Sequence, residues 1–285
     1  RGHEAGRHAA ALVRPAALVD AWLQEAADLQ RLDAHWNCPV DAVEPVRGGW
    51  CACDAAGRTV AEAPHVVVTA ALDSLRLLVP HGAPATLPLR PVQGQMSLAA
   101  LDGPPLAERP QRDNGVFVPD YADSGLPPQW PARIWAMGST YERGASPTDV
   151  RKDAHRRNEA ALRALVPEAA DRMGRLARDG QLSGWAQVRC ASLDRLPLAG
   201  ALPDLSAWAA LRASTRARPP LSAVPRLAGL HTLTALGSRG LSLAAWCAQA
   251  MACQMDGRAV DAPQDLLQAV DPARFAWRQS RRPPA

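Results

Sequence analysis

Apolar residues recur along the chain at two spacings, one typical of helices and one typical of strands. Between residues 15 and 29 they recur every three or four positions behind Pro15, a residue suited to the first position of a helix. Strand-like alternation follows over 38–46, then two short strands around Asp54–Gly57 and a buried strand over 65–71. This order of elements predicts a mixed α/β architecture.

The middle of the chain changes character. Segments 87–99, 114–125 and 132–144 are strand-like and are interrupted by proline and glycine, which predicts an antiparallel sheet in a second domain. A helix is expected from Pro147 to Val166, with Ser146 as its N-cap.

The last third returns to alternating strands and helices. Segment 183–200 is typical of strand, turn and strand, and 204–226 of a polar, proline-rich connection. A buried strand is expected over 230–236. The helix over 241–255 is apolar almost all round, so we expect it to be deeply buried. A short helical piece and a basic tail close the chain.

Composition narrows the class of protein. The 285 residues are 47% hydrophobic, and no apolar run approaches the roughly 20 residues of a membrane span, so we expect no membrane partner. Six cysteines without a CxxC pair predict free thiols in a cytoplasmic protein and no metal site. The net charge of +4 fits either a solvated surface or one that tolerates RNA. Because the chain begins with Arg1, we expect a fragment or a processed product.

The stretch Gly237-Ser238-Arg239-Gly240 joins the last buried strand to the apolar helix that starts at Leu241. Unpaired N–H groups and a partial positive charge lie at such a helix start, and glycine lets a ligand approach the backbone. The turn could therefore bind an anion or an electron-rich oxygen. The other interpretation is a tight turn that needs glycine and nothing more.

Three further positions are candidates for chemistry. Arg189 ends a buried strand and needs a partner, either a structural carboxylate such as Asp194 or a substrate carboxylate. Gly94 lies between two glutamines, which suits a strand that carries polar groups into a cleft or an edge strand with a bulge. Tyr141 could hydrogen-bond a ligand, or could simply leave its hydroxyl in water.

Five motifs occur together in the order of one known family. They are RPVQGQMS (90–97), GSTYERG (138–144), VRCASLDRLPLAG (188–200), LGSRGL (236–241) and DPARF (271–275). Together they resemble the oxidoreductase half of the MnmC family, bifunctional enzymes that modify the wobble uridine of tRNA. That half belongs to the D-amino-acid oxidase and glycine oxidase group of flavoproteins.

The resemblance implies a fold and a division into domains. An FAD-binding, Rossmann-like domain would comprise 1–88 and 183–285, without its first βαβ unit. It would be interleaved with a substrate domain, 89–182, built on an antiparallel sheet. The sequence has no GxGxxG segment, which a complete domain of this kind would carry.

The resemblance also implies an activity. FAD would oxidise the carboxymethylaminomethyl group of the wobble uridine, position 34 of tRNA, to aminomethyl with release of glyoxylate. Partners would be tRNA and a methyltransferase that uses S-adenosylmethionine, fused or separate. One alternative is an FAD-dependent oxidase of free glycine or sarcosine. Another, supported by the missing GxGxxG, is a cofactor-free remnant or a basic RNA-binding module.

The resemblance assigns roles to matching positions. Arg189 would hold the substrate carboxylate, Arg239 would lie at the cleft mouth, and Tyr141 is the third catalytic candidate. At position 71 family members often have glycine, whereas this chain has Ala71, and Phe117 stands where oxidases of small amino acids often have tyrosine. The residues expected to contact FAD are Val40, Thr69, Ala70, Ala71, Gly94, Gln95, Gly237, Ser238, Arg239, Gly240 and Leu241.

Overall fold

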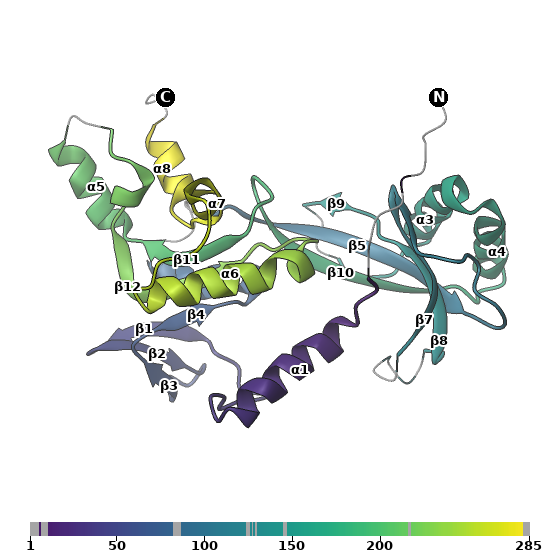
Figure 1. The fold of residues 1–285 in the computed structure, drawn as a ribbon, viewed down its shortest axis with the longest axis horizontal. Helices are drawn as coiled ribbons and strands as arrows, with labels where there is room; N and C mark the ends of the chain where they lie inside the picture. The colour runs from purple at the N-terminus through teal and green to yellow at the C-terminus, as the bar shows by residue number, and fades with distance from the viewer. Residues whose placement is uncertain are drawn as a thin grey trace.

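The computed structural model describes residues 6, 11–81, 87–123, 126, 128, 130–144, 147–215 and 218–281. It has two lobes joined by its two longest strands, β5 (Leu89–Ala100) and β10 (Ser183–Ser192), which run side by side from one lobe to the other (Figure 1). These strands are antiparallel and paired over the whole of β10. A residue at either end of β10 therefore has a fixed place relative to both lobes.

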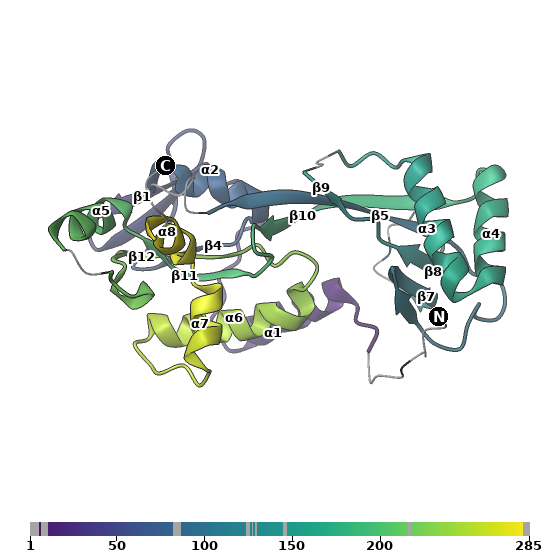
Figure 2. The same cartoon turned by 90° about the horizontal axis from the view of Figure 1, so that it is seen from above.

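One lobe is an antiparallel sheet covered by two helices. The strand order is β10-β5-β8-β7-β6, and β9 also pairs with β5. Phe117 and Trp135, both fully buried, lie edge to face in the core between the sheet and the helices. The antiparallel sheet expected for the middle of the chain is confirmed. Its other elements are β6 (Gln111–Asp113), β7 (Gly115–Ala122), β8 (Arg133–Gly138), β9 (Glu142–Arg143), α3 (Lys152–Leu165) and α4 (Pro167–Arg178) (Figure 2).

The other lobe contains two three-stranded sheets. An antiparallel meander comprises β1 (Ala42–Val46), β2 (Gly49–Cys53) and β3 (Thr59–Ala63). The second sheet has the order β11 (Leu198–Pro203), β12 (Arg226–Thr234), β4 (Val66–Val68). Between the sheets lies a core that includes Trp50, Val68 and Leu230. The helices are α1 (Pro15–Asp28), α2 (Ser74–Leu78), α5 (Leu205–Ser214), α6 (Gly240–Met255), α7 (Gln264–Val270) and α8 (Arg274–Ser280), with 3-10 turns η1 (Ala71–Asp73), η2 (Val79–His81) and η3 (Leu221–Ala223).

The pairing of β4 with β12 is parallel, and this positions the candidate site. In a parallel pair both strands end at the same edge of the sheet, where open α/β sheets bind ligands. At this edge β4 leads into Thr69 and Ala71, and β12 leads into the turn at Gly237. The Thr234 hydroxyl donates a hydrogen bond to the backbone oxygen of Ala71 at 3.1 Å, which ties the two strand ends together.

Helix α3 begins later than the sequence pattern predicts. It starts at Lys152 rather than at Pro147, and Ser146, the expected cap, lies outside the described residues. Arg151 is held extended, with φ −114° and ψ 139°, while the side-chain amide of Gln95 bonds both its backbone N–H and its backbone oxygen. This long-range clamp decides where the helix can begin.

Two other expectations for the last third are wrong. Helix α6 is not deeply buried, because it packs on β11 and β12 along one stripe centred on Cys247, and Leu241 is 57% exposed. Segment 204–226 is more than the polar, proline-rich connection that the sequence predicts. It contains α5, which is capped by the Asp204 carboxylate and anchored by buried Trp208.

Smaller differences concern the ends of elements. The strand expected over 38–46 begins at Ala42. Strand β10, which the sequence analysis assigns to the FAD-binding domain, is hydrogen-bonded along its whole length to β5 of the other lobe.

Helix α1 has no buried residue. Among the described residues, no helix is both long enough and apolar enough to cross a lipid bilayer.

Candidate active site

The glycine turn after β12 is attached to the end of β10. The Gly237 N–H donates to the backbone oxygen of Cys190 at 2.9 Å, and Leu236 forms an isolated bridge with Ala191. Gly237 has φ +58°, a left-handed conformation that favours glycine. The turn therefore needs its first glycine to fold back onto the strand that carries Arg189.

A hollow of about 480 Å³ opens beside this turn. Its walls come from both lobes, since Tyr141 follows β8, Ala191 belongs to β10, and the turn follows β12. The structure thus brings together three predicted site segments that are far apart in the sequence. The lining residues are Tyr141, Ala191, Asp194, Arg195, Leu196, Leu236, Gly237, Ser238 and Arg239.

The start of helix α6 lies at the same place. Arg239 is the N-cap residue, but its side chain makes no cap hydrogen bond and instead donates to the backbone oxygen of Arg195. In the described part of the chain the N–H groups of Gly240 and Leu241 make no backbone hydrogen bond outside the helix. Nothing lies within 4 Å of where a Cβ on Gly240 would be. These free donors, together with the helix dipole, favour an electron-rich group at this point.

Arg189 is held by one hydrogen bond and has an unused donor. Its Nη2 donates to the Ser139 hydroxyl at 2.6 Å. Its Nη1 is shielded from solvent and has no partner among the described residues. Burial lowers the pKa of the guanidinium, although Tyr141 acts in the opposite direction. A buried donor without an acceptor costs about 1–3 kcal/mol, so a carboxylate oxygen that reached it would gain that energy.

The alternative of a structural Arg189–Asp194 pair is wrong. Asp194 instead accepts hydrogen bonds from Arg274 at 2.8 Å and 3.0 Å and from Arg278 at 2.7 Å. The side chain of Arg274 is only 1% exposed, so its charge is the one that Asp194 neutralises. Arg189 is left without a carboxylate partner among the described residues.

Gly94 and Gln95 face opposite sides of β5. A methyl group on Gly94 would lie 2.1 Å from Nη1 of Arg189, so Gly94 is on the Arg189 side. The Gln95 side chain is fully buried and both of its polar atoms are bonded to the backbone of Arg151. The Gln95 side chain therefore shapes the site from behind, and the expected contact of Gln95 with the flavin stays a prediction.

The other residues predicted to contact the cofactor lie in two different places. Thr69, Ala70 and Ala71 lie at the edge where β4 and β12 end, as described above. Ala71 has φ +50°, the left-handed conformation in which glycine is the usual residue. Val40 packs against the core of its lobe, and its backbone oxygen accepts from Arg76 at 2.9 Å. Of the residues predicted to contact FAD, only Gly237, Ser238 and Arg239 line the hollow, and Arg189 does not line it either.

The sequence analysis missed Ser139, which positions Arg189. Ser139 belongs to the same GSTYERG motif as Tyr141, two positions before it. The pairing of Ser139 with Arg189 joins residues 50 positions apart, and no local pattern signals such a contact. Among the described residues, no three histidine, cysteine or acidic side chains gather where they could hold a metal ion.

Comparison with known proteins agrees with this geometry. The family model described as DAO, FAD dependent oxidoreductase, matches residues 5–254. The chain belongs to this family. It is 35% identical over 257 residues to the tRNA 5-methylaminomethyl-2-thiouridine biosynthesis bifunctional protein MnmC of Ralstonia nicotianae, a match that covers 88% of this chain and 37% of that protein. The chain thus spans little more than a third of this relative.

Two solved structures share the fold. An iminodiacetate oxidase from Chelativorans sp. BNC1 aligns with a TM-score of 0.61 over 87% of this chain and 56% of that one. A glycine oxidase from Geobacillus kaustophilus aligns with a TM-score of 0.54 over 79% and 50%. Both are 17% identical to this chain, which supports the fold alone. The expected mixed α/β fold of an FAD-binding oxidoreductase with an antiparallel sheet is confirmed.

The described residues fit a flavin cofactor at one edge of the β4–β12 sheet. Free N–H groups at the start of α6 and the open approach at Gly240 suit polar ring atoms and phosphate oxygens. Ala71, with its left-handed backbone, follows β4 at the edge of the sheet where β12 also ends. The residues that would hold FAD are Thr69, Ala70, Ala71, Gly237, Ser238, Gly240 and Leu241.

Proposed function

We propose that this chain is the oxidoreductase part of an MnmC-type enzyme. It would oxidise the carboxymethylaminomethyl group on the wobble uridine of tRNA to aminomethyl and release glyoxylate. The observation that carries the proposal is the unpartnered Nη1 of Arg189, which supplies a carboxylate-binding donor on the strand to which the glycine turn is bonded through Cys190. The similarity to MnmC supports tRNA as the substrate.

Bound FAD supplies a two-electron acceptor that turns the secondary amine into an imine, which water hydrolyses to the primary amine and glyoxylate. Arg189 would hold the carboxylate through a charge-assisted hydrogen bond and so orient the adjacent CH₂ group. The start of α6 would stabilise negative charge that develops next to it. Ser139 keeps the guanidinium in place while it does so.

The second candidate is an oxidase of free glycine or sarcosine, because the same arginine could grip a free amino acid. The basic tail does not help to decide between the two. Arg278 pairs with Asp194, and Arg281 lies 4.7 Å above the ring of Trp277, so both are engaged in the fold. Arg282 lies outside the described residues. A tRNA substrate would place the reaction in the cytoplasm, and a methyltransferase, fused or separate, would act on the aminomethyl product.

The first test is whether the purified chain binds FAD, read from its visible spectrum before and after FAD is added. A protein that stays colourless would show that this chain is a cofactor-free remnant or an RNA-binding module. Glyoxylate release from hypomodified tRNA is then compared with release from glycine. Faster release from tRNA supports the proposal, and release from glycine alone would favour the amino-acid oxidase.

A substitution tests the assignment of Arg189. In Arg189→Ala we expect carboxylate-dependent turnover to be abolished while FAD stays bound. Arg175→Ala, which changes an exposed arginine on α4, serves as the matched control and should keep both properties. Loss of FAD together with turnover in Arg189→Ala would show that Arg189 has a structural role.

A further inference from the structure

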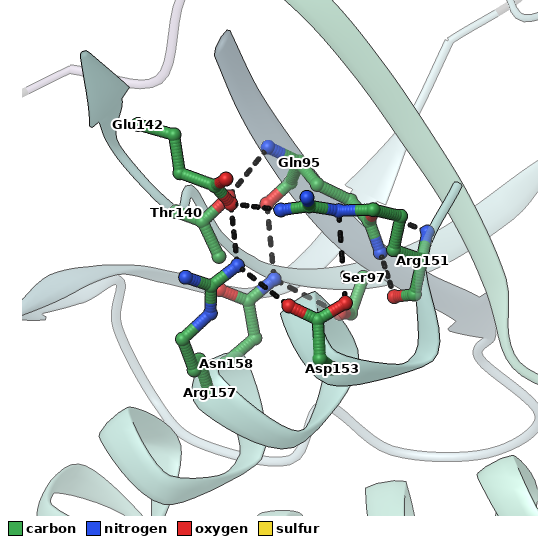
Figure 3. Close-up of polar contacts among 8 residues, drawn as sticks. All are labelled: Gln95, Ser97, Thr140, Glu142, Arg151, Asp153, Arg157 and Asn158. Carbon is green, nitrogen blue, oxygen red and sulfur yellow. Dashed lines mark hydrogen bonds and ion pairs between the residues drawn. The ribbon is translucent and has the colours of Figure 1, made fainter. Parts of the chain in front are cut away.

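Segment 139–142 connects the Arg189 face of the sheet to the helix face. Ser139 accepts the hydrogen bond from Arg189, Thr140 is buried against β5, and Glu142 reaches the start of α3. Figure 3 shows Thr140 and Glu142 side by side with the side chains of Arg151, Arg157 and Asn158. The segment is thus held from behind by side chains that do not touch the hollow.

Thr140 is locked to Gln95 in both directions. The Gln95 N–H donates to the Thr140 hydroxyl at 2.9 Å, and the Thr140 N–H donates to the Gln95 backbone oxygen at 3.1 Å. Asn158 from α3 donates to the same oxygen at 3.0 Å (Figure 3). Because Thr140 is only 8% exposed, these bonds are protected from water and fix the backbone of the preceding residue, Ser139.

Glu142 closes the other end of the segment. Its carboxylate accepts from both Arg151 and Arg157, and these two arginines also pair with Asp153 at 3.6 Å and 3.2 Å. The hydrogen bond from Arg151 is the main cause that lowers the pKa of Glu142 below its ordinary value. Arg151 is itself fixed, since the Gln95 amide bonds its backbone at 2.7 Å and 2.9 Å.

Segment 139–142 is connected to the Arg189 guanidinium by one hydrogen bond. Among the described residues, Ser139 is the single hydrogen-bond partner of the guanidinium. A shift of segment 139–142 would therefore move or release Arg189. Catalytic and binding groups need to be held within about 0.5 Å of their working geometry, and a supporting layer of side chains usually does this.

We propose that Thr140 and Glu142 are positioning residues for carboxylate recognition, which act on Arg189 through Ser139. The inference rests on the proposed function, since it takes Arg189 as the carboxylate-binding residue. It adds that the start of α3 and the Gln95 clamp set the affinity for the carboxylate from the far side of the sheet. A purely structural network would stabilise the lobe without affecting that affinity.

The test uses four variants of the whole chain with FAD bound. Thr140→Val keeps the shape but removes the hydroxyl, Thr140→Ser restores it, Glu142→Gln removes the charge of the carboxylate, and Thr232→Val is the matched control. Thr232 is a buried threonine on β12 whose hydroxyl donates to the backbone oxygen of Val68 at 2.9 Å, and it has no hydrogen bond to Gln95, α3 or segment 139–142 in the described structure. Affinity for acetate, a carboxylate with no amine to oxidise, is measured from the Arg189 Nε–Hε NMR signal.

We expect Thr140→Val to weaken acetate binding about tenfold or more and to shift the Arg189 signal in the free protein. Thr140→Ser should return to within about twofold of the parent, and Thr232→Val should lose stability without losing affinity. Glu142→Gln should act in the same direction as Thr140→Val. The inference is overturned if Thr140→Val binds acetate as the parent does, or if Thr232→Val weakens binding equally.

Failure of the proposed function would give a different result. If the parent protein does not bind acetate, Arg189 is not a carboxylate site and that assignment fails. The Arg189 signal still tests the positioning claim. A shift in Thr140→Val that is absent in Thr232→Val supports it, and equal signals in the two variants refute it.

Discussion

Gly94 and the guanidinium of Arg189 occupy adjoining space, so that a methyl group added to Gly94 would lie 2.1 Å from Nη1. It would also lie 2.8 Å from the backbone oxygen of Thr140, whereas real Cβ contacts essentially never fall under 3.0 Å. Since the side chain is freer to move than the backbone, the guanidinium should be displaced. We expect Gly94→Ala to raise KM for the carboxylate substrate about tenfold or more, with a smaller effect on kcat.

The control for this prediction is Gly174→Ala on α4. Its added methyl group would meet the Glu159 carboxylate at 3.0 Å, which is the flexible end of a side chain. Alanine is also the better residue within a helix. Steady-state kinetics of both variants check the prediction. An unchanged KM in Gly94→Ala would mean that Arg189 does not bind the carboxylate in the position seen here.

Ala71 has the backbone conformation of a glycine, with φ +50°, at the point where β4 ends. The left-handed conformation costs an alanine roughly 1–2 kcal/mol, whereas glycine adopts it freely but loses more entropy on folding. We expect Ala71→Gly to change the free energy of unfolding by between zero and about +1 kcal/mol, which is neutral or stabilising. Urea unfolding followed by circular dichroism measures this change.

The neighbouring Ala70 provides the matched control, because its φ of −82° suits any residue. Ala70→Gly should therefore lower the free energy of unfolding by about 0.5–1 kcal/mol, which is the entropic effect alone. The two alanines are adjacent and both exposed, so the comparison isolates backbone conformation. Equal losses in the two variants would contradict the left-handed conformation at Ala71.

Elements marked by local patterns could be predicted from the sequence. The strand at 89–100, the hairpin around Asp54–Gly57 and the turn at Gly237 depend on alternation and on glycine, which act over a few residues. The motifs also predicted that Arg189 and the turn belong to one site. The bond from Gly237 to Cys190 attaches the turn to the strand of Arg189, but Arg189 is not among the residues that line the hollow, so its role stays a prediction.

Features set by contacts between distant residues could not be predicted. The start of α3 depends on Gln95, which bonds Arg151 from 56 positions away. The partner of Asp194 is Arg274, 80 positions away, although Arg189 is much nearer in the sequence. The local sequence shows that a buried charged side chain needs a partner of opposite charge. It does not show which of several such residues is that partner. The exposure of Leu241 likewise depends on which segments cover α6, and its apolar sequence does not specify them.

Asp194 neutralises buried Arg274, and this pair gives a prediction that depends on pH. Burial alone would raise the pKa of Asp194, but hydrogen bonds from Arg274 and Arg278 outweigh it and hold the pKa well below its ordinary value. Below about pH 4, the range where an unpaired aspartate titrates, the unfolded chain therefore binds more protons than the folded chain does. The contribution of Asp194 to stability is complete above that pH and is lost progressively below it.

Asp194→Asn should lower the free energy of unfolding at pH 7 by about 3–5 kcal/mol, since it leaves the Arg274 charge buried without a counter-charge. The difference between the parent and this variant should shrink as the pH falls below about 4, because the unfolded parent then binds a proton at Asp194 that the folded parent does not, which lowers the stability of the parent. Urea unfolding at several pH values checks both statements. Asp256→Asn, which breaks the exposed pair with Arg258, is the control and should have a much smaller effect. Equal losses in the two variants, or a difference that does not change with pH, would show that Asp194 does not hold Arg274 as an ion pair.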